Sequence, residues 1–174
     1  NDFPCIQTCL PWQLRRTSVA FCISRSLPMT RVDFYFNAES KSRIVYRICL
    51  KVIQNRMGVD ILCPEYEISR SLDKYLWTAS AIGFVPHEIR KSGQSRIAPV
   101  SIVSEIGPLE SSSTLINLSR SVPPEFNKYE RLIEIVSAED DVDKSEARER
   151  HRFYKARGYA LTHHDLSSSE LRQN

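Results

Sequence analysis

Glycine is scarce in this chain, and its placement argues against the common nucleotide-binding loops. The 174 residues contain five glycines, at positions 58, 83, 93, 107 and 158, and none belongs to a Gly-x-Gly-x-x-Gly or Walker pattern. The loop after the first predicted strand, residues 37–41, contains no glycine. Because the backbone approaches a bound pyrophosphate closely only at glycine, the sequence predicts no dinucleotide site there.

Metal-binding and nucleophilic patterns are also missing. The five cysteines are Cys5, Cys9, Cys22, Cys49 and Cys63. They form no Cys-x-x-Cys pair, no paired-histidine zinc element accompanies them, and an odd number of scattered thiols fits a reducing compartment such as the cytoplasm. His163 and His164 are adjacent, so in an extended chain they point to opposite faces and make a poor metal site. We therefore predict no metal, no cofactor and no catalytic residues.

Long apolar runs and a strong net charge are absent as well. No segment approaches the roughly 18 uncharged apolar residues of a membrane span, so we expect a soluble protein without a membrane partner. The formal charge is only +3, which does not by itself support nonspecific nucleic-acid binding, so contact with DNA is expected only indirectly. With 41% apolar and 26% charged residues, the composition is that of one globular domain.

The first 28 residues differ from the rest of the chain. They hold three of the five cysteines and three arginines, but one acidic residue, Asp2. A transit peptide or a signal peptide is a possible interpretation, but three prolines interrupt any helix and the apolar run is short. We predict that residues 1–28 are an upstream extension, that the native domain covers residues 29–166 and starts at Met29, and that residues 167–174 form a solvated tail.

Strands and helices are predicted to alternate along this domain. Strands are expected at residues 31–36, 59–63, 84–86, 99–103, 115–118 and 132–136, with a final edge strand at residues 159–163. Helices are expected from the Ser40 cap to Gly58, from Pro64 to Trp77, and from Asp140 or Asp141 to Gly158. This alternation predicts a single Rossmann-like α/β domain with a mostly parallel sheet and helices on both faces.

The last predicted helix carries a basic stripe, which we define as Arg148, His151, Arg152 and Lys155. These residues follow one another at i, i+3, i+4 and i+7 and share one helix face. The alternative is an ordinary solvated face with ion pairs, for which Glu146 to Arg150 and Glu149 to Arg152 have the right spacing.

Exposed charge pairs contribute only about 0.2 to 1 kcal/mol each, so a stripe that binds an acidic partner needs an apolar pocket beside it. Val136 or Phe153 is expected to supply the pocket walls, and Phe153 is equally suited to a place in the core.

A second candidate surface surrounds Trp77 and Phe84, at the end of a predicted helix and the start of a predicted strand. Large aromatic side chains contribute strongly to protein interfaces and are equally common in cores. The sequence leaves both interpretations open.

The segments from Met29 to about Leu166 resemble the chi subunit family of bacterial DNA polymerase III, the clamp-loader accessory proteins. The resemblance is carried by residues 32–36, Leu76-Trp77, residues 84–87, 115–118, 122–124 and 131–136, and then by Ala147 to Arg150, Phe153-Tyr154 and Gly158-Tyr159. Each piece is short, and their order and spacing together make the match specific.

The resemblance implies a non-catalytic accessory subunit of the replicative polymerase. Its implied partners are the psi subunit, the clamp-loader complex through psi, and the acidic, phenylalanine-terminated tail of single-stranded-DNA-binding protein (SSB). The implied SSB-tail site is Val136, Lys144, Arg148, His151 and Arg152, to which the basic stripe adds Lys155. The implied psi site is Trp77, Phe84, Pro86 and His87. At position 151 the resemblance implies an aromatic residue, and this chain has histidine, which makes the contact sensitive to pH.

One function from another class remains open at this point. A doubly wound α/β fold often belongs to a nucleotide-binding enzyme, and Glu39 and Lys41 follow the first predicted strand, where such folds bind ligands. Direct binding of single-stranded DNA is not favoured, because that needs aromatic residues within a continuous basic groove.

Overall fold

The computed structural model describes residues 30–80, 83–91, 93–107 and 112–167. The predicted upstream extension and nearly all of the predicted tail lie outside the described residues.

A seven-stranded sheet forms the centre of the domain, with the strand order β3-β4-β2-β5-β6-β1-β7. The strands are β1 (Arg31–Ala38), β2 (Gly58–Leu62), β3 (His87–Arg90), β4 (Val100–Val103), β5 (Ser112–Asn117), β6 (Arg131–Ser137) and β7 (Leu161–Asp165). All the strand pairings are parallel, from β3 with β4 at one edge to β1 with β7 at the other. Parallel sheets are covered on both faces, which explains the nearly continuous apolar runs of β2 and β4.

The third strand is the clearest error in the predicted elements. The segment Phe84 to Pro86 is not a strand, and β3 starts one residue later, at His87. Proline has no backbone N–H to donate to a neighbouring strand, so pairing begins only after Pro86. The other predicted strands overlap the observed ones, and the predicted edge strand is β7, which pairs with β1.

The helices are α1 (Lys41–Gln54), α2 (Tyr66–Thr78) and α3 (Asp141–Ala156), with a short 3-10 helix, η1 (Phe126–Lys128). Ser40 caps α1 as predicted, because its side chain accepts a hydrogen bond from the Arg43 amide. Asp140 caps α3 in the same way, and Gly158 follows the helix with a φ of +78°, which favours glycine. Helix α2 begins two residues after Pro64, with Glu65 at its N-cap position.

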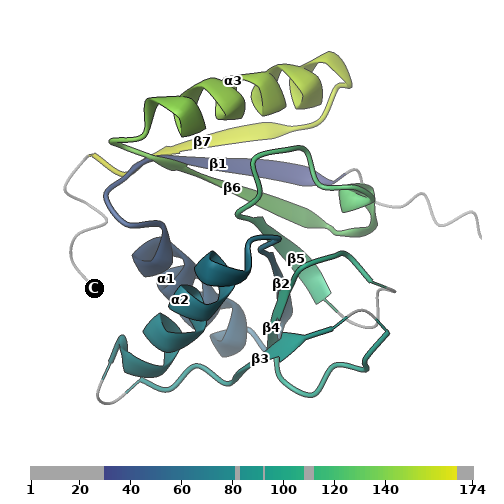
Figure 1. The fold of residues 1–174 in the computed structure, drawn as a ribbon. Coiled ribbons are helices and arrows are strands. Elements are labelled where there is room, and N and C mark those ends of the chain that lie inside the picture. Colours follow the sequence, from purple (N-terminus) through teal and green to yellow (C-terminus); the bar gives the residue numbers. More distant parts are fainter. Residues whose placement is uncertain (1–29, 81–82, 92, 108–111, 168–174) are drawn as a thin grey trace, which may run out of the picture.

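The helices lie on both faces of the sheet, as predicted (Figure 1). Helices α1 and α2 cover one face, where Val45, Cys49 and Leu76 pack in one buried cluster with Ile61. Helix α3 covers the other face, where Tyr154 and Ala147 belong to a second cluster with residues of β1, β5 and β6. The confirmed fold is therefore an α/β sandwich with α3 set apart from the other two helices.

A buried polar network anchors α3 to the sheet. The Nε of Arg150 donates to one carboxylate oxygen of Glu134 on β6 at 3.0 Å, and the Tyr154 hydroxyl and the Asn117 amide donate to the other at 2.8 and 3.0 Å. Complete burial raises the pKa of the Glu134 carboxyl, while Arg150 and these donors oppose that rise.

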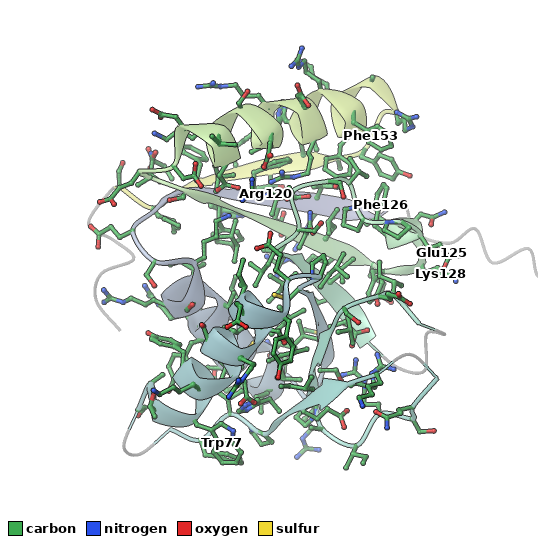
Figure 2. All side chains as sticks on the ribbon, in the orientation of Figure 1. Trp77, Arg120, Glu125, Phe126, Lys128 and Phe153 are labelled. Atoms are coloured by element: carbon green, nitrogen blue, oxygen red, sulfur yellow. The ribbon has the colours of Figure 1, made fainter. Side chains whose placement is uncertain are left out.

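The predicted ion pair between Glu146 and Arg150 is wrong. Glu146 instead lies 3.8 Å from Arg120, and Arg150 faces the core. The backbone carbonyl of Arg120, a residue labelled in Figure 2, also accepts a hydrogen bond of 2.8 Å from the Arg150 guanidinium. The spacing on the helix allowed Glu146 to pair with Arg150, but in the folded chain Arg150 pairs with the buried Glu134.

Candidate functional site

A pocket of about 580 Å³ opens between α3 and the carboxyl-terminal ends of β1 and β6, with β7 on its other side. We call it the α3 pocket. Its lining residues are Phe34, Phe36, Asn37, Val136, Ser137, Lys144, Ala147, Arg148, His151, Arg152 and His163. Ligands of open α/β sheets commonly bind at the carboxyl ends of strands, so this position is typical of the fold.

The inner wall of the α3 pocket is apolar. Phe34 and Phe36 come from β1, Val136 from the end of β6, and Ala147 from α3. Val136 was expected to line a pocket, and it does. The alternative wall residue, Phe153, does not line it, because its ring packs edge-on against Tyr154 and lies 3.6 Å from the Arg157 guanidinium.

Cations from successive turns of α3 form the rim of the α3 pocket. Lys144, Arg148 and Arg152 repeat every four residues and all line it. The predicted Glu149 to Arg152 ion pair is wrong: among the described residues neither Arg148 nor Arg152 has an ion pair, and the Arg152 Nε donates to the Arg148 carbonyl at 3.4 Å. Two exposed guanidinium groups therefore remain available at the pocket mouth.

Lys155, the last member of the basic stripe, is exposed but does not line the α3 pocket. Lys144, which the stripe did not contain, does line it, and its Nζ lies 2.9 Å from Asp141 one turn earlier. The structure thus gathers Val136, Lys144, Arg148, His151 and Arg152 around one cavity and leaves Lys155 outside.

Two histidines meet at one side of the α3 pocket. The Nε2 atoms of His151 on α3 and His163 on β7 are 3.0 Å apart, a hydrogen-bond distance. Both rings also contact Phe34, at centroid distances of 5.3 and 6.1 Å. Sequence reasoning identified His151 and missed His163, together with Phe34 and Phe36. Alternation along the last strand was the available signal, but it did not reveal which face of the sheet each residue joins.

His164 lies on the other face of the sheet from this pair. Its ring stacks on Tyr35 with centroids 4.4 Å apart, and it does not line the α3 pocket. Neighbouring residues of a strand point to opposite faces, as predicted for these two histidines. Within the described part of the chain, no group of three or more histidine, cysteine or acidic side chains is arranged to hold a metal ion.

The second candidate surface is an exposed aromatic cluster, which we call the aromatic surface and define as Trp77, Phe84, Pro86 and His87. Trp77 and Phe84 are each 57% exposed, and their ring centroids are 5.2 Å apart. His87 fixes the base of the cluster, because its Nε2 lies 3.1 Å from an Asp73 oxygen and its Nδ1 lies 2.7 Å from the Val85 carbonyl. The sequence left open whether these two rings are buried, and in the structure both face solvent.

The two candidate sites are well separated. Figure 2 shows Trp77 at the end of α2 pointing away from the domain, at the opposite end of the molecule from Phe153 of α3. The aromatic surface therefore lies at the end of the molecule away from α3, the helix that carries the cations of the α3 pocket.

The cysteines that the structure describes are unreactive core residues, as predicted. Cys49 and Cys63 are both buried. Burial raises the pKa of Cys49 to about 12, and burial together with the Glu65 charge raises that of Cys63 to about 11. The thiolate is the reactive form, so neither side chain serves as a nucleophile at neutral pH. No helix among the described residues is both long and apolar enough to span a membrane.

Together the fold and the α3 pocket define a Rossmann-like α/β protein with an open, cation-rimmed pocket at the strand ends and no glycine-rich phosphate loop. The sequence pattern described as "DNA polymerase III chi subunit, HolC" matches residues 29–162. The chain belongs to this family.

Three relatives, each named DNA polymerase III subunit chi, support the assignment. The Pseudomonas aeruginosa protein is 30% identical over 142 residues, which cover 79% of this chain and 98% of the relative. The Haemophilus influenzae protein is 29% identical over 137 residues, covering 75% and 93%. The Escherichia coli protein is 32% identical over 123 residues, covering 68% and 81%. The chain is thus a non-catalytic accessory subunit of DNA polymerase III and acts in DNA replication.

Among solved structures, the chain is similar in fold to the C-terminal domain of Saccharomyces cerevisiae Dbp5 bound to Gle1 and IP6. The TM-score is 0.52, the sequence identity is 9%, and the match covers 83% of this chain and 94% of the other. At this identity the likeness concerns the α/β architecture alone.

Proposed function

We propose that this subunit connects the clamp loader to single-stranded-DNA-binding protein in the bacterial cytoplasm. In this proposal the α3 pocket binds the acidic, phenylalanine-terminated tail of SSB, and the aromatic surface binds the psi subunit, which joins the clamp loader. The subunit contacts DNA only through these partners.

The single observation that carries the tail assignment is the combination of an apolar wall with unpaired guanidinium groups at one opening. Arg148 and Arg152 lie on the rim and have no ion pair among the described residues, while Phe36 and Val136 line the wall. Guanidinium groups form strong, directional hydrogen bonds with carboxylates, and an apolar cavity accepts an aromatic ring. An acidic peptide with an aromatic end has both features.

The exposure of two large aromatic rings supports the assignment of the aromatic surface to psi binding. Monomeric proteins bury most of their aromatic side chains, and exposed tryptophan and phenylalanine in contact with each other are typical of protein interfaces. The aromatic surface holds such a pair, Trp77 and Phe84, on a base fixed by His87.

The direct test of the proposal is capture of SSB by the immobilised subunit. We expect full-length SSB to be retained, and to be released by a synthetic peptide with the sequence of its own acidic tail. SSB that lacks the tail is the matched control and should pass through. Equal retention of the full-length and tailless proteins would contradict the tail assignment.

For the aromatic surface we predict that Phe84→Ala reduces copurification of coexpressed psi at least fivefold, because truncating a central aromatic anchor costs about 1 to 2 kcal/mol or more. The variant should keep its thermal unfolding midpoint within about 2 °C, since the Phe84 ring is 57% exposed. Ile97→Ala is the control, because Ile97 is 91% exposed and lies outside the aromatic surface. Recovery of psi at the wild-type level with Phe84→Ala would reject this surface.

The alternative of a nucleotide-binding enzyme is tested by thermal unfolding with ATP, GTP or NAD. Any ligand that binds only the folded state raises the unfolding midpoint, so a reproducible rise would favour the alternative. We expect no shift, because the loop after β1 has no glycine to approach a phosphate.

A further inference from the structure

The pair of histidines in the α3 pocket has a role that the rim cations do not supply. The pair joins two separate elements, since His151 is on α3 and His163 is on β7, and their Nε2 atoms are 3.0 Å apart. Two imidazole nitrogens at this distance share one hydrogen, so one ring donates through Nε2 and the other accepts at a bare Nε2. The second nitrogen of the donor ring, Nδ1, then has an available lone pair.

This arrangement accepts one further proton but resists two. A proton added to the free Nδ1 of the donor ring makes an imidazolium and leaves the shared hydrogen bond intact. A second proton would have to occupy the accepting Nε2, which removes that hydrogen bond and places two positive rings in contact. The geometry of the pair therefore has room for one added positive charge but not for two.

The surroundings of the pair disfavour a positive charge on His151 in the free protein. Desolvation, followed by the charges of His163 and Lys155, lowers the pKa of His151 below its ordinary value of 6.5. Three α3 cations line the α3 pocket with the pair, Lys144, Arg148 and Arg152, and Lys155 outside the pocket also acts on His151. Asp165 follows His163 by two residues on β7, while β1 and β6 contribute the uncharged Asn37 and Ser137. The carboxylate of Asp165 accepts from the Asn37 amide and the Ser167 backbone amide, at 2.8 and 2.9 Å.

We propose that His151 and His163 form a proton-coupled carboxylate subsite of the α3 pocket, which takes up one proton from solution when an acidic peptide docks beside it. This inference rests on the proposed tail-binding function. A peptide carboxylate in the pocket offsets the repulsion from the α3 cations and favours the imidazolium. Proton uptake and peptide binding therefore strengthen each other.

The direction in which peptide affinity changes with pH follows from this coupling. Because a bound carboxylate favours the protonated form of the pair, affinity increases as pH falls through the ordinary histidine range. The carboxylates of the peptide, with ordinary pKa values near 4, stay ionised there. We expect the dissociation constant to fall about three- to tenfold from pH 7.5 to pH 5.5, as for one charge-assisted hydrogen bond gained at a partly exposed site.

Calorimetric titration with a synthetic acidic peptide that ends in phenylalanine tests the inference. At pH 6.5, measurements in two buffers with different ionisation enthalpies should give an uptake of roughly half a proton per peptide for the wild-type protein. His151→Phe, which keeps a ring against Phe34, and His163→Gln should both bind with a smaller proton uptake and a flatter pH profile than the wild-type protein. His164→Gln is the matched control, because that ring lies on the opposite face of the sheet.

The outcomes separate the two proposals. Wild-type behaviour of both His151→Phe and His163→Gln, or affinity of the wild-type protein that does not change with pH, would overturn the carboxylate subsite. If the peptide binds independently of pH but substitution of Arg148 still abolishes binding, the tail-binding function stands and only the carboxylate subsite is rejected. Absence of peptide binding at every pH would overturn both. His163 is an exposed strand residue, so the test does not depend on His151→Phe being folded.

Discussion

Reversing the charge of Arg148 is expected to weaken binding of the acidic SSB tail at least tenfold. Arg148 lies on the rim of the α3 pocket and has no ion pair among the described residues, so its guanidinium is available to a ligand. A hydrogen bond to a charged group contributes about 1.5 to 3 kcal/mol, which corresponds to a loss of roughly ten- to a hundredfold. Arg148→Glu removes this contact and adds repulsion. Calorimetry at low salt measures the effect most directly, because salt screens exposed charges.

Lys155→Glu provides a matched control with the same charge change on the same helix. Lys155 belongs to the predicted basic stripe, but it does not line the α3 pocket. We expect it to change affinity less than about threefold, as for an exposed charge acting at a distance. Equal losses of tail affinity in Arg148→Glu and Lys155→Glu would mean that the tail binds along the basic stripe and not in the α3 pocket. Unchanged affinity in Arg148→Glu would reject the tail site itself.

Substitution of Arg150 by methionine is expected to destabilise the fold by about 3 to 5 kcal/mol, the usual cost of leaving one member of a buried ion pair alone. Arg150 is 3% exposed and Glu134 is fully buried, and Arg150 is the positive charge 3.0 Å from that carboxylate. Urea denaturation measures the change in the free energy of unfolding. Arg152→Met, on the exposed side of the same helix, should stay within about 0.5 kcal/mol of the wild-type protein.

The loss in Arg150→Met should depend on pH. Burial raises the pKa of Glu134, and removing the arginine that opposes this rise raises it further. A carboxyl whose pKa is raised in the folded state contributes stability only while it is protonated, so stability declines as pH rises above its unfolded value near 4.5. We therefore expect a larger deficit at pH 8 than at pH 5.5. The same deficit at both values would show that Glu134 is not the group left unpaired.

Much of the fold was predictable from local patterns. The Ser40 cap, the apolar run of β2 and the helix stop at Gly158 all follow from residues close in sequence, and each lies where it was expected. The error at Phe84 to Pro86 has a local cause too, since the pattern of large apolar residues outweighed the missing N–H of Pro86.

The sites were less predictable, because a helical stripe does not reveal its neighbours. Arg148, Arg150 and Arg152 are chemically identical and lie within five residues, yet Arg150 is buried against Glu134 while the other two reach the pocket rim. Likewise, the exposure of Trp77 and Phe84 depends on how α2 ends beside the sheet, and the sequence left burial and binding equally open.

The sequence by itself determined the alternation of strands and helices, the absence of a phosphate-binding loop, and the face of the last helix that carries cations. These depend on residue types and on spacings of a few positions, which short-range geometry converts directly into structure. Only the tertiary structure decided which cations border an apolar cavity, and that His163 joins His151 although 12 positions separate them. Such contacts depend on the sheet order, which places β7 beside β1 and both beneath α3, and no local spacing records that order.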